Sequence, residues 1–166
     1  MVIPARKKLF GFTLIELLIV IAILGILAAA VLVAVNPKKR QDQAKDANIK
    51  ADVGSLATAL QAYYTAPGQG SYPDNAVGEG LQLLVDNGDL KQKPTPPNGS
   101  TTVAYVYGIS PGTCDLDAVP VVLCEESYVY ADLVDDDTDT LLWCWESIEG
   151  KAEAEALAAC TDFTVD

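Results

Sequence analysis

An uninterrupted apolar run from Phe12 to Val35 constrains this chain more than any other feature of its sequence. The run of 24 residues contains one charged residue, Glu16, and no proline. About 20 apolar residues in a helix span the hydrocarbon core of a bilayer. We therefore expect a membrane-spanning helix here, with the rest of the 166-residue chain forming one modest domain.

Glu16 is the residue of this run that needs an explanation. A charged side chain at the centre of a transmembrane helix costs about 2.5–3.5 kcal/mol on insertion scales. A plain membrane anchor gives no reason for that cost. An ordinary secretory signal peptide gives none either, although Ala28-Ala29-Ala30 resembles its cleavage site and would release a secreted binding domain starting near Val31.

Basic residues flank the apolar run on both sides, at 6–8 and again at 38–40. Basic flanks tend to stay in the cytoplasm, so these two groups oppose each other and do not fix the orientation. The cysteines favour an outward-facing domain. Cys114, Cys124, Cys144 and Cys160 form no C-x-x-C pair, which argues against zinc, and an even count suits an oxidising compartment.

Two disulfides among four cysteines can be connected in three ways. The short loops favour Cys114–Cys124 with Cys144–Cys160, and the other connectivities stay open. The chain contains no histidine, which excludes Ser-His-Asp and Cys-His catalysis and His-ligated metals. No nucleophile–base pair is visible, so we do not expect an enzyme.

The charge balance limits the kinds of molecule that this chain can bind. The formal net charge is −12, and residues 55–166 hold three lysines against 19 acidic residues, a balance of −16. Such a surface repels phosphate backbones, so we expect no direct nucleic-acid binding by it. Clustered carboxylates in a loop suit Ca²⁺, and the weak calcium candidate is the set Asp135, Asp136, Asp137 and Asp139. The alternative is a solvated hairpin loop, and we expect no other metal or cofactor.

Beyond the apolar run, an amphipathic helix continues to about residue 64. Its apolar residues recur every three or four positions and form one stripe: Ile49, Val53, Leu56, Leu60 and Tyr63. Asp46 and Lys50 are spaced to pair at i, i+4. Residues 12–64 could be one helix about 80 Å long. Alternatively, Asn36-Pro37 could cap and begin a second helix, with a kink between the two.

The remainder reads as a small antiparallel sheet preceded by loops. Residues 65–75 are rich in Gly, Pro, Ser and Asn, which predicts a loop, and leucines at 81–90 predict a short helix. Alternation at 103–109, 128–133 and 141–145 predicts strands. The Ala- and Glu-rich tail at 149–160 predicts a short helix, which Cys160 could tie to Cys144. The expected class is α+β: a long helical spine, transmembrane in its first half and amphipathic in its second, packed against the sheet.

The stretch KLFGFTLIELLIVIAILGILAAAV resembles the N-terminus of type IV pilins and pseudopilins, over residues 6–35. In that family a peptidase cuts after a glycine and methylates the new amino terminus. The resemblance implies cleavage between Gly11 and Phe12, N-methylation of Phe12, and an assembly role for Glu16, the fifth residue after the cut. Cleavage creates an amine that a carboxylate can pair with, and a paired buried charge is tolerable where a lone one is costly.

Pilins often loosen their helix between a glycine and a proline, so Gly25 and Pro37 are the expected weak points. The usual proline would sit near Val33, one turn earlier than here. The implied organisation is a basic leader at 1–11 that is removed, a filament-core helix at 12–36, an amphipathic stalk at 37–64 and a globular head at 65–166.

By resemblance, the chain is a structural subunit that is inserted in the inner membrane and then polymerised into an extracytoplasmic filament at the cell surface. The implied partners are further pilin subunits, the prepilin peptidase, an inner-membrane platform protein and an assembly ATPase. The nearest alternative is a pseudopilin of a type II secretion or DNA-uptake machine, which shares this N-terminus.

Overall fold

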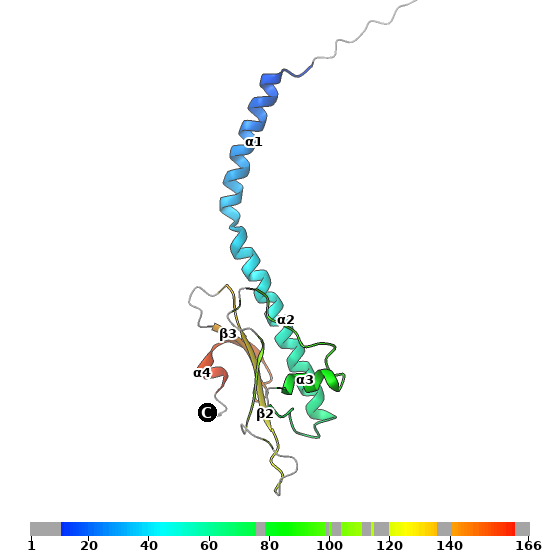
Figure 1. Cartoon of the computed structure of the whole chain (residues 1–166). Helices are drawn as coiled ribbons and strands as arrows, with labels where there is room; N and C mark the ends of the chain where they lie inside the picture. The colour runs from blue at the N-terminus through cyan, green and yellow to red at the C-terminus, as the bar shows by residue number, and fades with distance from the viewer. Residues whose placement is uncertain are drawn as a thin grey trace, which may run out of the picture. The chain divides into compact units, whose positions relative to one another are not determined.

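The computed structural model describes residues 11–75, 79–98, 100, 104–110, 114, 120–135 and 141–161 (Figure 1). The chain divides into two compact units, residues 1–40 and 41–166, and the boundary falls within the second helix. The first unit holds a helix that is apolar all round. The second holds an α+β domain, which is the class expected from the sequence.

Helix α1 spans Leu14–Val35 and helix α2 spans Pro37–Thr65. Asn36 separates them in the left-handed conformation, with φ 43°, which asparagine tolerates better than most residues. Proline lacks the N–H that a continuing helix needs but suits the first position of a new one. Asn36 Oδ1 also accepts the backbone N–H of Lys39 at 3.4 Å. The sequence left open whether residues 12–64 form one helix or two, and the structure has two, with the second beginning at Pro37. Helix α1 continues through Gly25 without a break.

The apolar stripe predicted on α2 forms the centre of the domain core. Ile49, Val53, Leu56 and Leu60 are completely buried, and Tyr63 packs against the same cluster. Each such aliphatic side chain contributes about 1.5–3 kcal/mol when it leaves water. This burial fixes which face of α2 the rest of the domain covers.

One antiparallel sheet packs on that face, with its strands in the order β1-β2-β3-β4. The strands are β1 Val106–Ser110, β2 Glu126–Asp132, β3 Leu141–Glu146 and β4 Ala152–Ala156. Burial alternates along β1 and β2, as the strand patterns predict. The side chains that the sheet and the segment just before β1 add to the core include Tyr105, Tyr107, Ile109, Val129, Ala131 and Trp145.

The opposite face of the sheet carries a second, smaller cluster. Leu142, Cys144 and Cys160 are buried there, and the rings of Tyr128 and Tyr130 stack beside them with centroids 6.0 Å apart. Tyr128 lies across from Gly108, where a Cβ atom would collide with the tyrosine ring. The glycine therefore makes room for the aromatic side chain on this face.

Two short helices complete the domain. Helix α3, Gly80–Asp86, buries Leu81 and Leu84 and matches the helix expected from the leucines. The C-terminal helix α4 covers Leu157–Cys160 alone. The expectation of a helix over 149–160 is therefore wrong for its first part, which forms strand β4. Alanine and glutamate favour helices, but pairing with β3 overrides that preference.

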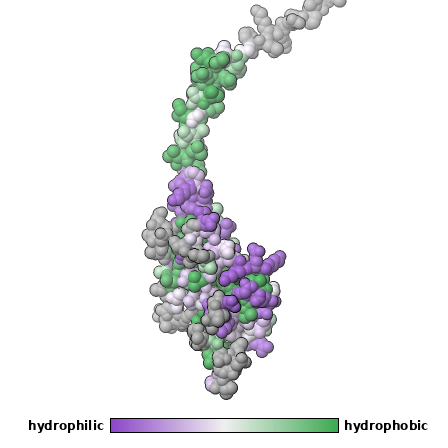
Figure 2. All heavy atoms as spheres, viewed as in Figure 1, coloured by the Kyte–Doolittle hydropathy of each residue, from purple (hydrophilic) through white to green (hydrophobic). Residues whose placement is uncertain are grey.

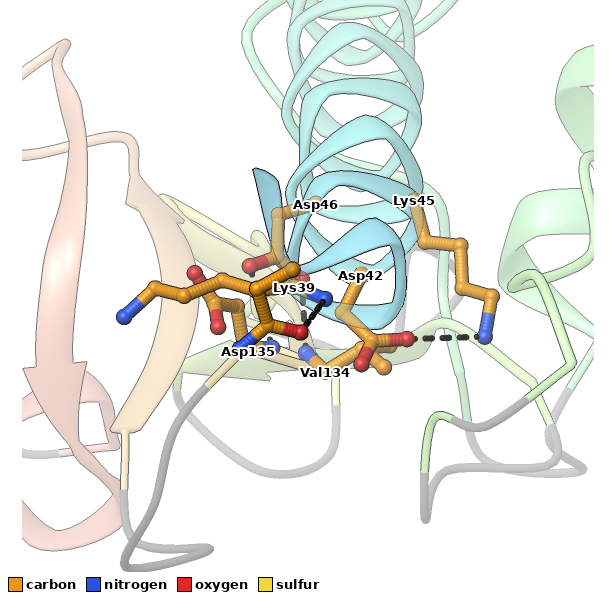
Figure 3. A network of polar contacts seen from close by, with 7 residues as sticks. Lys39, Asp42, Lys45, Asp46, Val134 and Asp135 are labelled. Carbon is orange, nitrogen blue, oxygen red and sulfur yellow. Dashed lines mark hydrogen bonds and ion pairs between the residues drawn. The ribbon is translucent and has the colours of Figure 1, made fainter. Parts of the chain in front are cut away.

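The predicted ion pair between Asp46 and Lys50 is also wrong. The Asp46 carboxylate instead accepts two backbone N–H groups, from Val134 at 2.6 Å and from Asp135 at 3.1 Å (Figure 3). The Lys50 ammonium lies 4.5 Å from the ring centroid of Trp143, a cation–π contact. The Asp46 carboxylate binds backbone N–H groups that are distant in the sequence, rather than the lysine one helical turn away.

Candidate processing and assembly site

The candidate cleavage site lies where the described chain begins. Gly11 and Phe12 precede α1 without regular structure, and Phe12 is 84% exposed. A peptidase needs an accessible, non-helical backbone, which this segment offers. The basic residues 6–8 of the expected leader lie outside the described residues.

Glu16 takes part in a capping box at the start of α1. The Thr13 hydroxyl accepts the backbone N–H of Glu16 at 3.3 Å, and Glu16 Oε2 accepts the backbone N–H of Thr13 at 2.9 Å. Oε2 also accepts the Thr13 hydroxyl proton at 2.7 Å. These bonds satisfy donors that every helix start leaves open, and they hold the carboxylate one turn from Phe12.

Thr13 is the site residue that sequence reasoning missed. The T-x-x-E spacing of Thr13 and Glu16 ahead of an apolar run is a signature of a helix start and could have revealed it. Both Thr13 bonds use Oε2. Among the described residues, Oε1 accepts no hydrogen bond, so one oxygen of Glu16 is left to accept another donor.

Apart from Glu16 in its first turn, the surface of α1 is apolar all round. None of its residues is buried within the structure, and its 22 residues are long and apolar enough to cross a membrane (Figure 2). Soluble proteins rarely expose an apolar surface of this extent. The helix therefore requires lipid or other apolar protein surfaces around it.

The weak calcium candidate is described only at its first residue. Asp135 donates its backbone N–H to Asp46, whereas Asp136, Asp137 and Asp139 lie outside the described residues. Elsewhere in the described ranges, two groups of three potential ligands lie close together: Asp74 with Cys114 and Cys124, and Glu146 with Cys144 and Cys160. The sulfurs of both groups are in disulfides, so they are not the thiolates that bind metals.

Two disulfides fasten the domain. Cys114 pairs with Cys124 and Cys144 with Cys160, with Cα atoms 5.4 Å and 5.9 Å apart. This is the connectivity that the short loops favoured. The second bond ties the helix after β4 to β3, on the face of the sheet that points away from α2.

Comparisons with known proteins agree with the geometry. A family model described as "Prokaryotic N-terminal methylation motif" matches residues 6–32, which include Gly11, Phe12 and Glu16. The type II secretion system core protein G of Pseudomonas aeruginosa is 37% identical over 121 residues, covering 65% of this chain and 78% of that protein. A fimbrial protein of Neisseria meningitidis is 38% identical over 93 residues, or 55% of this chain and 52% of that protein. No solved structure matches the chain.

A helix start with a capped acid, an apolar helix and a sheet packed on a second helix define a filament subunit of the pilin type. The chain belongs to the family of type IV pilins and pseudopilins. This confirms the family and the fold class expected from the sequence. Membership in a structural family also confirms that the chain is not an enzyme, and it implies processing by a prepilin peptidase and polymerisation.

Proposed function

We propose that this chain is a prepilin that is cleaved between Gly11 and Phe12, methylated on the new amine and polymerised into a type IV pilus-like filament outside the cytoplasm. The exposed, non-helical Gly11-Phe12 segment supports the cleavage step. The single observation that carries the proposal is the position of Glu16. It lies capped by Thr13 at the head of an apolar helix, within a methylation-type motif.

The assembly step follows from the chemistry of Glu16. Its carboxylate is costly in an apolar environment unless a cation neutralises it. Cleavage supplies such a cation, the amine of Phe12, and Oε1 is the oxygen available to accept it from a neighbouring copy. An incoming subunit would then register against the filament by pairing its own amine with an unpaired Glu16.

The surface chemistry of each segment of the chain suggests its role in the filament. Residues 12–36 would form the transmembrane and then the filament-core segment, because α1 needs apolar surroundings. Residues 37–64 would form the stalk and 65–166 the head, after removal of residues 1–11. Membrane-embedded subunits would be delivered to the filament by a platform protein and an assembly ATPase, and the finished filament would stand at the cell surface.

A second candidate is a pseudopilin of a type II secretion machine. The length of the alignment with the Pseudomonas aeruginosa secretion protein, 78% of that protein against 52% of the fimbrial protein, favours it. A DNA-uptake pseudopilus would share the same N-terminal chemistry. Electron microscopy of native cells separates these candidates when it is combined with deletion of the gene. Surface filaments lost on deletion favour the pilus, whereas loss of secretion or of transformation without visible filaments favours a pseudopilus.

Mass spectrometry of the N-terminal peptide from the native protein tests the common part of the proposal. We expect a peptide that begins at N-methylated Phe12. A protein that begins near Val31 would mean that the apolar segment is a signal peptide, and the filament proposal would fall. An intact N-terminus would identify α1 as a plain anchor, with the same consequence.

A further inference from the structure

The cations that follow the apolar helix are concentrated at the start of α2. Five Lys or Arg residues lie within 38–50, whereas residues 55–166 contain Lys91, Lys93 and Lys151 alone. The acidic residues are distributed in the opposite way, with 19 of them at 55–166. Each subunit therefore carries a basic segment and a strongly acidic head.

Three of the five cations have no carboxylate partner among the described residues. Lys45 pairs with Asp42 at 3.1 Å, and Lys50 is placed over Trp143. Lys38, Lys39 and Arg40 are exposed and make no ion pair within the described ranges. We call these three residues the basic triplet. Figure 2 shows hydrophilic surface directly after the apolar helix, where the chain continues into the triplet.

The acidic head offers a surface that fits a Lys or Arg side chain. A hollow of about 200 Å³ is lined by Asp74, Glu79, Gln82, Leu83 and Asp86, on α3 and the loop before it. The three acidic residues are exposed, and hydrophilic surface gathers over α3 in Figure 2. Leu83 adds an apolar wall, 37% exposed, that suits the hydrocarbon stem of a long cation. We call this surface the α3 hollow.

The head has few cations of its own, three lysines against 19 acidic residues at 55–166. Lys151 is held between Glu149 at 2.7 Å and Glu153 at 2.9 Å. Heads with a balance of −16 repel one another when they are packed side by side, and screening is incomplete within a Debye length of about 10 Å at 0.1 M salt. A polymer of this chain therefore needs cations between adjacent heads.

An open helical polymer grows through two different patches, one on each of the copies that meet. A basic patch and an acidic patch on the same chain meet that requirement, whereas a self-complementary patch closes a dimer. We propose that the basic triplet of one copy docks against the α3 hollow of a second copy and that this contact sets which heads become neighbours. The inference rests on the proposed filament, and it adds a contact between the stalk and the head to the pairing at Glu16.

Charge reversal with rescue tests this contact. We expect the triple variant Lys38→Glu, Lys39→Glu and Arg40→Glu to be processed normally but to yield about tenfold less filament, the effect of losing several surface ion pairs. The reciprocal variant, Asp74→Lys, Glu79→Lys and Asp86→Lys, should behave alike. Combining both sets in one chain should restore most of the yield, which damage to the fold would not allow.

Reversal of Lys91 and Lys93 to glutamate is the matched control, since it removes the same kind of charge outside the triplet. It should lower the yield far less than reversal of the triplet does. Failure of the combined variant to recover, when each half reaches the membrane folded, would overturn the inference. A triplet variant that assembles normally but no longer binds vesicles of anionic phospholipid would assign the cations to lipid and would also overturn it.

Cysteine cross-linking separates this inference from the filament proposal. Arg40→Cys combined with Glu79→Cys should give a ladder of oligomers on mild oxidation of intact cells, and Arg40→Cys with Lys91→Cys should not. A ladder in cells without filaments would support the contact while the filament proposal fails. Filaments without a ladder and without charge rescue would leave the filament standing and reject the contact.

Discussion

The carboxylate of Asp46 accepts the backbone N–H of Val134 at 2.6 Å, across 88 positions of sequence. A second bond from the N–H of Asp135 makes the acceptor bidentate. Asp46 lies one turn before Ile49 on the buried stripe of α2, so the bonds fasten the end of β2 to the start of the helical core. Figure 3 shows Asp46 directed at Val134 and Asp135, while Asp42 and Lys45 pair with each other.

Replacing Asp46 should therefore destabilise the domain. We expect Asp46→Ala to lower the free energy of unfolding by about 3 kcal/mol, because two half-buried N–H groups lose a charged acceptor. Denaturant unfolding of the detergent-solubilised full chain measures this, since both tryptophans, Trp143 and Trp145, lie in the sheet and report its unfolding by fluorescence. Asp42→Ala is the control and should cost less than about 1 kcal/mol. Equal losses in the two variants would contradict the assignment.

Removing the Cys144–Cys160 bond should loosen β4 in particular. Its loop spans 16 residues, for which chain-entropy arguments predict a loss of about 3 kcal/mol. We expect Cys144→Ala with Cys160→Ala to accelerate amide hydrogen exchange in Ala152–Ala156 far more than in β2. The double variant Cys114→Ala with Cys124→Ala should leave exchange in β4 near its normal rate. Unchanged exchange in β4 after loss of the first bond would show that strand pairing alone holds it.

The stability of the domain should depend on the protonation of Glu155. Burial, followed by a hydrogen bond to Glu153 and the charges of neighbouring glutamates, raises the pKa of Glu155 to about 7 from its usual 4.5. The folded state therefore binds this proton more tightly than the unfolded state. The resulting penalty is absent below pH 4.5, grows as the pH rises and is complete above pH 7.

Glu155→Gln mimics the protonated acid, so it should stabilise the protein at pH 8 and change little at pH 5. Unfolding curves at the two pH values measure the difference. Glu153→Gln should have the opposite sign at pH 8, because a hydrogen bond to Lys151 lowers the pKa of Glu153 and favours its charged form. A Glu155→Gln effect of the same size at both pH values would contradict the assignment.

Substitution of Glu16 should separate processing from assembly. We expect Glu16→Ala to be cleaved, methylated and inserted normally, but filament yield should fall about 100-fold because, in the proposed pairing, the Phe12 amine loses its partner. Quantification of sheared filaments, with mass spectrometry of the N-terminus, measures both steps. Thr13→Ala removes the helix cap but keeps the carboxylate, and it should assemble. Normal yield from Glu16→Ala would reject the pairing mechanism.

The parts of the fold that follow from local periodicity could be predicted from the sequence. The stripe at Ile49, Val53, Leu56 and Leu60 was recognisable because helical spacing places these residues on one face. Alternation at 128–133 predicted a strand for the same reason, and the structure has strand β2 at Glu126–Asp132. The disulfide pairing was the one favoured by loop length, which is also a local property, although loop length left the other connectivities open.

Features decided by distant partners could not be predicted in this way. Strand β4 is composed of Ala and Glu, and its pairing with β3 appears only when the sheet is assembled. The bond from Val134 to Asp46 is likewise invisible to i, i+4 reasoning. At the candidate site, Glu16 stood out as a lone charge in an apolar run. Its partner Thr13 was overlooked because a threonine is a common residue, and its role as N-cap is clear only when the first residue of the helix is known.

The disulfide between Cys144 and Cys160 sets the order of two steps in the maturation of this protein, export and completion of the head. Helix α4 is joined covalently to β3 only when two thiols have been oxidised, and thiols stay reduced in the cytoplasm. Export thus precedes the final locking of the domain. A host that lacks a thiol oxidase outside its cytoplasm is therefore a poor choice for making this protein.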